Sequence, residues 1–350
     1  MGVNNKRPII GITMGDPASI GPEITLKCLS SKNVYEKCKP IVVGDAKCLE
    51  NAKKIVNLNN IEINSIEDVQ SARFEYGIID VLDMHNADMD LIKIGKISKQ
   101  AGEASFQYVD KVIELALNGE VDATVTNAFS KEAINLAGHH YSGHTEVYAE
   151  KTATEKYTMM LVYKNIRVVH VSTHCALRDA CDKVKKERIL DVIKIAQKAC
   201  LDLGIDKPRI GVAGLNPHCG ENGLFGNEET DEIIPAINEA KQLGICVDGP
   251  VPADTIFSKI RGNWYDIVVA MYHDQGHIPL KVLGFVYNDQ AQKWDAVEGV
   301  NITLGLPIIR TSVDHGTAFD QAGTGNASEL SLKNALEYAI TMANVRNSKR

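Results

Sequence analysis

Residues 9–29 read IIGITMGDPASIGPEITLKCL, and this stretch decides the class of fold. The apolar run Ile9–Met14 is typical of a buried strand, and a turn rich in glycine and proline leads from it into an expected helix, Gly21–Leu29. Pro22 lies in the first helical turn, where its missing N–H is harmless, and Glu23 suits the positive end of the helix. A strand, a polar turn and a helix in this order predict an α/β protein.

The same alternation repeats along the chain. The further strand-like runs are Pro40–Val43, Gly77–Val81, Ala123–Thr126, Met159–Tyr163, Arg167–Val171, Arg209–Ala213 and Ile267–Ala270. The further expected helices are Ala101–Leu117, Lys186–Leu203, Thr230–Leu243 and Ser328–Asn344. Several strands run into polar turns, and ligands of open α/β sheets bind beyond the carboxyl ends of strands. These turns are therefore candidate site loops.

Length, composition and charge limit the classes of protein to which the chain can belong. A chain of 350 residues, 44% of them hydrophobic, predicts about two domains with a sizeable core. The net charge of −7 argues against a nucleic-acid-binding protein, although a few local cations can still bind an anionic substrate. No stretch approaches the roughly 20 apolar residues of a membrane span. The first residues do not resemble a signal peptide and the eight cysteines include no CxxC pair, so we expect a cytoplasmic protein with reduced thiols.

Three histidines stand where strands are expected to end. His174 follows the run Val168–Thr173, His218 follows Asn216-Pro217, and His273 opens a polar turn. Neutral imidazoles are good ligands for divalent metals. The long spacings match no local zinc motif, so these histidines either share a metal or are ordinary polar loop residues.

Other side chains suit an anionic substrate. Lys281 and Arg310 stand near apolar runs, where a buried cation needs a phosphate or carboxylate partner, although Lys281 is equally explained as a surface charge. The sequence Gly143-His144-Thr145-Glu146 is typical of a helix start that offers donors to an anion, or of a simple N-cap box. Asp254 and Asp274 are candidate oxygen ligands or orienting groups, and the alternative for Asp254 is a helix cap.

Residues 313–325 read VDHGTAFDQAGTG. Three glycines among small residues allow the backbone to approach a flat or phosphorylated ligand closely. No GxGxxG fingerprint follows the first strand and no Walker motif occurs. A nicotinamide enzyme built on this chain would therefore not use the Rossmann fingerprint.

Taken together, these motifs resemble the 4-hydroxythreonine-4-phosphate dehydrogenase family of pyridoxine (vitamin B6) biosynthesis, including its D-threonate/D-erythronate 4-phosphate dehydrogenase branch. The matching segments are residues 15–23, 143–146, 172–174, 214–218, 252–255, 272–276 and 300–323. Seven motifs in order, spread over essentially the whole chain, are far more specific than any one of them.

The resemblance implies a fold of the isocitrate/isopropylmalate dehydrogenase type, with two α/β/α domains and an active site in the interdomain cleft. We expect residues 1–135 and 306–350 to form a first domain that carries the NAD loop. Residues 136–305 are expected to form a second domain that carries the metal ligands and dimer contacts. The family also implies a homodimer in which the neighbouring subunit completes each active site.

The resemblance also assigns roles to residues. The divalent metal, zinc first and otherwise cobalt, nickel, iron, magnesium or manganese, is expected on His174, His218 and His273. The expected substrate-binding residues are His144, Thr145, Lys281, Asn301 and Arg310. The expected NAD-binding residues are His315, Gly316, Thr317, Ala318, Asp320 and Gly323. The candidate catalytic residues are Asp254, Asp274 and Lys281, and the general base stays open between the two aspartates and a water molecule.

The implied reaction is an NAD-dependent and metal-dependent oxidative decarboxylation of a 4-phosphorylated 3-hydroxy acid. The metal would act as a Lewis acid during the oxidation and the loss of carbon dioxide. The candidate substrates are 4-hydroxythreonine 4-phosphate, D-threonate 4-phosphate and D-erythronate 4-phosphate. Two alternatives on the same architecture are a phosphate acyltransferase-like transferase and a non-catalytic protein that binds a phosphorylated ligand. The three histidines and the residues 315–325 favour the dehydrogenase.

Two departures from the commonest family sequence leave the substrate open. His277 stands where the vitamin B6 enzymes often have a small or apolar residue and the threonate branch often has histidine. The added stretch from Val286 to Gly299, which contains Trp294, joins two expected substrate positions. It is either a surface insertion or an element that selects the substrate.

Overall fold

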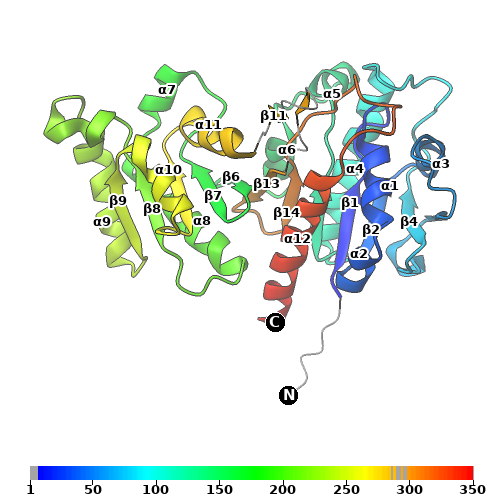
Figure 1. Ribbon diagram of the computed structural model, residues 1–350, viewed down its shortest axis with the longest axis horizontal. Coiled ribbons are helices and arrows are strands. Elements are labelled where there is room, and N and C mark those ends of the chain that lie inside the picture. The colour runs from blue at the N-terminus through cyan, green and yellow to red at the C-terminus, as the bar shows by residue number, and fades with distance from the viewer. Residues whose placement is uncertain (1–6, 285–286, 289–292, 295–297, 350) are drawn as a thin grey trace. The chain divides into compact units, whose positions relative to one another are not determined.

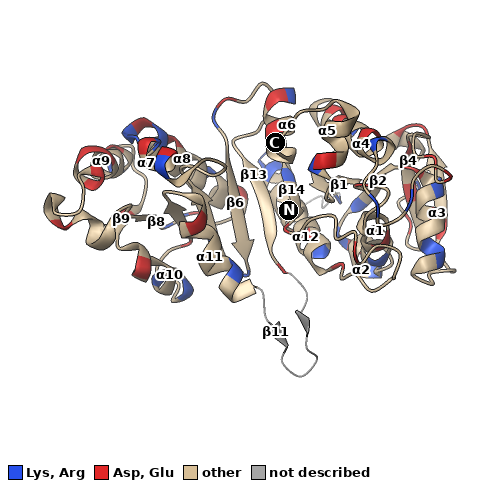
Figure 2. Ribbon diagram, turned by 90° about the horizontal axis from the view of Figure 1, so that it is seen from above, with Lys and Arg blue, Asp and Glu red and all other residues tan. Residues whose placement is uncertain are grey.

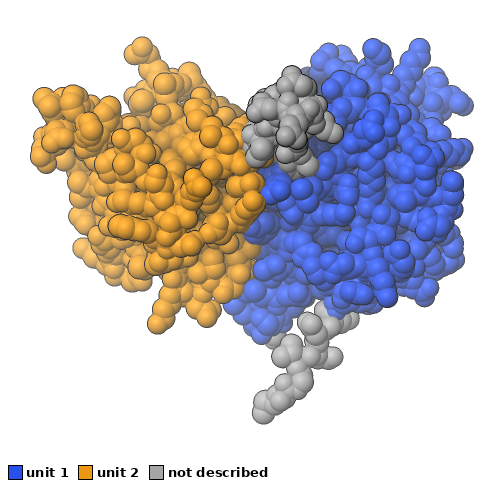
Figure 3. Space-filling model, in the orientation of Figure 1, with its two compact units in different colours: residues 1–154, 296–300, 306–350 blue, residues 155–295, 301–305 orange. Residues whose placement is uncertain are grey.

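The computed structural model in Figure 1 describes residues 7–284, 287–288, 293–294 and 298–349. The chain forms two compact units, which Figure 3 shows in two colours. Unit 1 comprises residues 1–154, 296–300 and 306–350, and unit 2 comprises residues 155–295 and 301–305. The sequence places the first boundary earlier, at residue 135. Residues up to 154 belong to unit 1 because the buried Tyr148 donates a hydrogen bond to Thr124 there, at 3.0 Å.

Unit 1 is built on parallel strands in the order β3-β4-β2-β1-β5-β14. The strands are β1 (Ile9–Thr13), β2 (Lys39–Gly44), β3 (Glu62–Ile66), β4 (Ile78–Asp83), β5 (Ala123–Thr126) and β14 (Arg310–Val313). The helices are α1 (Gly21–Leu29), α2 (Lys32–Lys37), α3 (Ala46–Ile55), α4 (Lys99–Leu117), α5 (Lys131–Ala137), α6 (His144–Lys151) and α12 (Leu330–Ser348).

The helices of unit 1 form two groups that cover its strands. Helix α1 packs against α3 and α12, whereas α4 packs against α5 and α6, and Figure 2 shows the two groups on opposite sides of the strands. Gly11 explains how closely α4 approaches β1, because a Cβ at this position would lie 2.8 Å from Val112 Cγ2. Unit 1 therefore has the α/β/α layering that the family resemblance implies.

Unit 2 has strands in the order β13-β6-β7-β10-β8-β9, of which β7, β10, β8 and β9 are parallel and β6 is antiparallel to β7. The strands are β6 (Thr158–Tyr163), β7 (Ile166–His170), β8 (Ile210–Ala213), β9 (Val247–Val251), β10 (Ile267–Ala270) and β13 (Val300–Leu304). The helices are α7 (Leu177–Asp182), α8 (Lys186–Asp202), α9 (Ile234–Gln242), α10 (Ala253–Arg261) and α11 (His273–Gly284). Helices α10 and α11 share one apolar core with β6, β7 and β10.

The expected insertion at residues 286–299 lies mostly outside the described residues. Within it, β11 (Tyr287–Asn288) and β12 (Lys293–Trp294) pair in antiparallel fashion. All eight cysteines are free. In the part of the chain that the structure describes, no helix is both long enough and apolar enough to cross a bilayer.

Candidate functional site

A buried cation marks the first candidate region, which lies in unit 1 beside β5. Arg310 is only 3% exposed, and its Nη2 donates a hydrogen bond of 2.7 Å to Thr126 Oγ1. Its Cζ lies 5.5 Å from the ring centroid of Tyr148. Burial lowers the pKa of Arg310 to about 10, so the guanidinium still carries its charge at neutral pH. A buried guanidinium of this kind suits an anionic ligand.

His144 lies close to this cation at the start of α6. Its ring stacks on Phe129 with centroids 3.7 Å apart. Burial, and then the positive charge of Arg310, hold the pKa of His144 well below its ordinary value, so the imidazole is neutral. Within the described residues its Nε2 is buried and has no hydrogen-bond partner. The structure therefore brings together His144 and Arg310 of the predicted substrate set, with Thr145 next in the same helix turn.

The second candidate region is the histidine group of unit 2. The ring centroids of His174 and His273 lie 6.0 Å apart. Asp274 Oδ1 is 2.6 Å from His273 Nδ1, so the carboxylate favours the tautomer in which Nε2 is free to bind a metal. The residues from Tyr272 to Gly276 were predicted to be a polar turn, but helix α11 begins at His273 instead.

His277 packs directly on this predicted ligand. Its ring stacks on that of His273 with centroids 3.6 Å apart and planes 14° apart. Its Nδ1 also lies 2.9 Å from the backbone oxygen of His273. Burial, and then the nearby His273, lower the pKa of His277 to about 4. His277 is thus a neutral ring that fixes the orientation of His273.

His218 lies in a left-handed turn. The φ angles of His218, Cys219, Glu221 and Asn222 are 52°, 56°, 43° and 56°, a conformation that L-residues rarely adopt. Among the described residues, no group of three or more His, Cys, Asp or Glu side chains is arranged to hold a metal ion. The described chain therefore does not bring His218 into one group with His174 and His273, and the three-histidine centre stays a prediction.

Glu229 holds the backbone just before the turn that contains His218. The sequence does not single out Glu229 as a functional residue. This carboxylate is 1% exposed, and its Oε1 accepts hydrogen bonds from the N–H groups of Leu215 and Asn216 at 2.8 and 2.7 Å. It stands among four acidic residues in the stretch 228–232, and nothing in that stretch distinguishes it as buried.

The remaining predicted residues of unit 2 are spread over three elements. Asp254 lies exposed in the first turn of α10, and the helix-cap alternative is wrong, because Pro252 is the N-cap residue. Burial, and then the negative charges of Glu229 and Asp254, raise the pKa of Cys219, the residue after His218. Lys281 lies exposed two turns after His273 on α11, and Asn301 lies in β13.

The predicted NAD loop follows β14 and lies against α1. The N–H of Ile20 donates to the oxygen of Thr317 at 3.3 Å, and the N–H of Gly323 donates to Glu23 Oε1 at 2.6 Å. His315 Nδ1 lies 2.8 Å from the oxygen of Gly316, and burial lowers the pKa of His315. Gly316, Thr317, Ala318 and Asp320 thus belong to one loop of unit 1, which is bonded to Ile20 just before α1 and to Glu23 within it.

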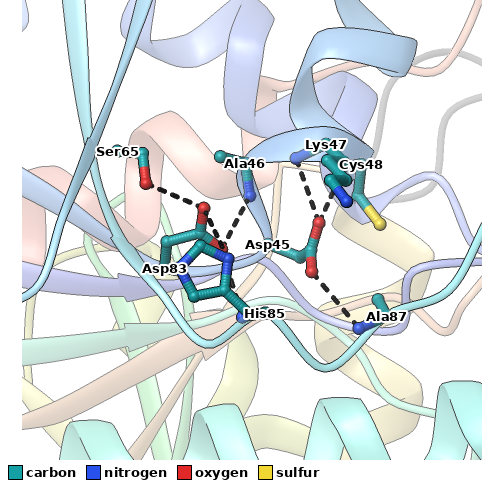
Figure 4. A network of polar contacts seen from close by, with 8 residues as sticks. All are labelled: Asp45, Ala46, Lys47, Cys48, Ser65, Asp83, His85 and Ala87. Carbon is teal, nitrogen blue, oxygen red and sulfur yellow. Dashed lines mark hydrogen bonds and ion pairs between the residues drawn. The ribbon is translucent and has the colours of Figure 1, made fainter.

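A polar cavity of about 480 Å³ lies beyond the carboxyl ends of β2 and β4, where sequence reasoning placed no site. Figure 4 shows its framework. Asp45 accepts the N–H groups of Lys47, Cys48 and Ala87, and Asp83 accepts those of Ala46 and His85. Both carboxylates are therefore occupied in tying residues 83–87 to the start of α3.

Comparison with known proteins identifies near full-length relatives. The family model described as pyridoxal phosphate biosynthetic protein PdxA matches residues 36–339. A protein of Oceanobacillus iheyensis named "Putative D-threonate 4-phosphate dehydrogenase" is 48% identical over 340 residues, which are 97% of this chain and 99% of that protein.

Solved structures agree with this similarity. The crystal structure of a 4-hydroxythreonine-4-phosphate dehydrogenase from Burkholderia phymatum has a TM-score of 0.82 and 45% identity over 96% of this chain and 98% of its own. The corresponding enzyme structure from Klebsiella pneumoniae has a TM-score of 0.83 and 43% identity over 96% and 99%. A phosphotransacetylase from Staphylococcus aureus, at 12% identity and a TM-score of 0.53, is similar in fold alone.

Proposed function

The chain belongs to the PdxA family of pyridoxal phosphate biosynthetic proteins, and from this premise we propose that it is an NAD- and metal-dependent dehydrogenase that oxidises and decarboxylates D-threonate 4-phosphate. The structural observation that carries the proposal is the buried guanidinium of Arg310 beside the neutral imidazole of His144. Such a pair suits a phosphate or carboxylate and gives no advantage to a neutral substrate.

The substrate chemistry then follows from its carbon skeleton. NAD would supply the acceptor for the C3 hydrogen, which leaves as a hydride with both electrons of its bond, and the C3 alcohol would become a ketone as its hydroxyl proton is lost. The resulting β-keto acid breaks its C1–C2 bond, carbon dioxide leaves, and C2 takes up a proton. A phosphorylated three-carbon hydroxyketone remains. The same steps on 4-hydroxythreonine 4-phosphate would leave an aminoketone phosphate.

The residues of unit 1 would hold the anionic end of the substrate. Arg310 offers a planar fork of donors that matches two phosphate oxygens. His144 is neutral, so one ring nitrogen donates while the other accepts. Fixing the substrate in this way orients the C3 hydrogen and lowers the entropic part of the barrier.

The residues of unit 2 would hold the metal. A divalent ion on imidazole ligands supplies Lewis-acid chemistry at the C3 oxygen. His174 and His273 are close enough to serve as two of its ligands, and Asp274 orients the second of them. This contact favours a positioning role for Asp274 over the role of general base. Asp254 and Lys281 stay candidates for proton transfer.

We propose that a second copy of the chain completes each metal site. Within the described residues of one chain, no three His, Cys, Asp or Glu side chains form a group that could hold a metal ion. The helix that begins with His273 also exposes two apolar side chains, Ile278 at 58% and Val282 at 73%. They are four residues apart and therefore share one face of α11. An interface on this face would place a partner's residues close to His273.

The substrate proposal is tested by comparing three candidates in an NAD-reduction assay. We expect kcat/KM for D-threonate 4-phosphate to exceed that for 4-hydroxythreonine 4-phosphate by about 100-fold, because a site that hydrogen-bonds a neutral C2 hydroxyl is poorly matched to an ammonium group. D-erythronate 4-phosphate, which differs only in configuration, is the control for shape. A preference for 4-hydroxythreonine 4-phosphate would contradict the substrate proposal and leave the dehydrogenase intact.

The dimer proposal is tested with Val282→Asp. We expect this variant to be monomeric by analytical ultracentrifugation and to lose bound metal, because a buried unpaired carboxylate disfavours the interface. Leu243→Asp is the matched control, since Leu243 is an exposed apolar residue, at 56%, at the end of α9. A Val282→Asp variant that stays dimeric with full metal would place the interface elsewhere.

A further inference from the structure

Glu23 lies in the first turn of α1, where its charge alone would suit the helix end. In the structure, however, the carboxylate accepts hydrogen bonds from a distant loop. Its Oε1 accepts the N–H of Gly323 at 2.6 Å and its Oε2 accepts the N–H of Gly325 at 2.8 Å. Glu23 is 2% exposed. Both oxygens are therefore directed at a loop about 300 residues away in the sequence.

Lys27 contacts the same loop from one helical turn further along. Its Nζ donates to the backbone oxygens of Gly325 and Ala327, the second at 2.7 Å. Residues four apart lie on the same face of a helix, so Glu23 and Lys27 act on neighbouring peptides. Glu23 accepts hydrogen bonds from backbone N–H groups, and Lys27 donates hydrogen bonds to backbone C=O groups. Together they fix the position of residues 323–327 along α1.

The other end of the loop is held by close backbone approach. The N–H of Gly95 donates to the oxygen of Ala18 at 2.8 Å, next to the motif that opens α1. A Cβ on Gly95 would lie 2.9 Å from the backbone oxygen of Phe319. The loop is thus contacted near its start by Ile20 and Gly95 and at its end by Glu23 of α1.

We propose that Glu23 and Lys27 are positioning residues that hold residues 315–325 in the conformation that binds NAD, an inference that rests on the NAD dependence proposed above and on the expected role of this loop. Hydrogen bonds to ionised groups are shorter and about twice as strong as those between neutral groups. A loop ordered before binding costs the cofactor less entropy than a loop that must be ordered by it. The hydrogen bonds of Glu23 and Lys27 to this loop go to its backbone, so through them the two side chains act on NAD by way of the loop.

The test uses Glu23→Gln in the full-length protein. Glutamine keeps the shape, but its amide nitrogen faces a backbone N–H and cannot accept it. Without NAD, we expect the amides of residues 323–325 to exchange hydrogen at least about tenfold faster than in the unmutated protein, as measured by mass spectrometry. We expect the Kd for NADH and the KM for NAD to rise about tenfold, with kcat lowered less than about twofold and the KM for the phosphorylated acid unchanged.

Two further variants complete the design. Glu337→Gln is the control, because Glu337 is an exposed carboxylate on α12 that pairs with Lys37 at 2.6 Å, and it should change none of these quantities. Lys27→Met removes the ammonium and keeps the apolar stem, and it should weaken NADH binding about threefold. If Glu23→Gln does not fold, Lys27→Met decides the question by the same measurements.

The outcomes separate this inference from the proposed function. Faster exchange together with weaker NADH binding supports both. Faster exchange with unchanged NADH binding, or unchanged exchange, overturns the inference and leaves the dehydrogenase standing. If the unmutated protein neither binds NADH nor reduces NAD, the proposed function fails and the inference fails with it.

Discussion

Replacing His273 with alanine is expected to lower kcat/KM for NAD reduction by at least about 10³-fold, because the Lewis-acid stabilisation supplied by a bound metal is worth several kcal/mol. Asp274→Asn should lower activity by about 10- to 100-fold, since it weakens only the orientation of the ligand ring. Metal content by elemental analysis should fall in parallel.

His218→Ala should lose metal without unfolding, because His218 is exposed in this chain.

The control for this prediction is His85→Ala. Its side chain is 68% exposed and lies beside Asp83 in unit 1, whereas the histidine group belongs to unit 2. It should keep both metal and activity. A divalent-metal chelator should abolish NADH production by the unmutated enzyme. Full activity after chelation, or a His273→Ala variant that retains one metal per chain, would rule out the metal-dependent mechanism.

Replacing Arg310 with methionine is expected to lower kcat/KM by about 10²- to 10³-fold, mostly through a higher KM for the phosphorylated acid. The reason is that the guanidinium is buried and charged, and phosphate would replace its lost hydration. The melting temperature should stay the same or rise, because the variant no longer buries a charge. Arg310→Lys should not restore activity, since a point charge lacks the planar fork of donors.

Arg209→Met is the matched control for Arg310. Arg209 has the same guanidinium, but its side chain is 48% exposed and pairs with Asp266 on the surface. Steady-state kinetics and thermal unfolding should both be close to those of the unmutated protein. If Arg310→Met instead lowers the melting temperature strongly and leaves KM unchanged, the guanidinium is a structural group and the anion site lies elsewhere.

Elements with a strong local signal could be predicted from the sequence. The strands Ala123–Thr126 and Ile267–Ala270 and the helix Gly21–Leu29 agree residue for residue with β5, β10 and α1. Strands of parallel sheets are buried on both sides, so they appear as short continuous apolar runs between polar turns. The family resemblance rested on motifs at the ends of such strands, and the comparisons confirm it.

Elements whose stability comes from distant contacts could not be predicted in the same way. Strand β9, Val247–Val251, contains Gly249 and Pro250, which locally disfavour a strand, yet it pairs with β8. Helix α11 contains Pro279 and begins inside a predicted turn. In both cases packing on neighbouring strands outweighs local propensity.

The sequence by itself determined the α/β class, the family and the list of candidate residues, because each of these depends on patterns a few residues long. Only the tertiary structure decided which candidates meet. It placed Arg310 beside His144 and stacked His277 on His273, and among the described residues it formed no group of three side chains that could hold a metal. It also showed that Glu23, which the sequence explains as a charge at a helix end, accepts the N–H groups of Gly323 and Gly325. Contacts between residues hundreds of positions apart depend on how the elements pack, and local sequence does not carry that information.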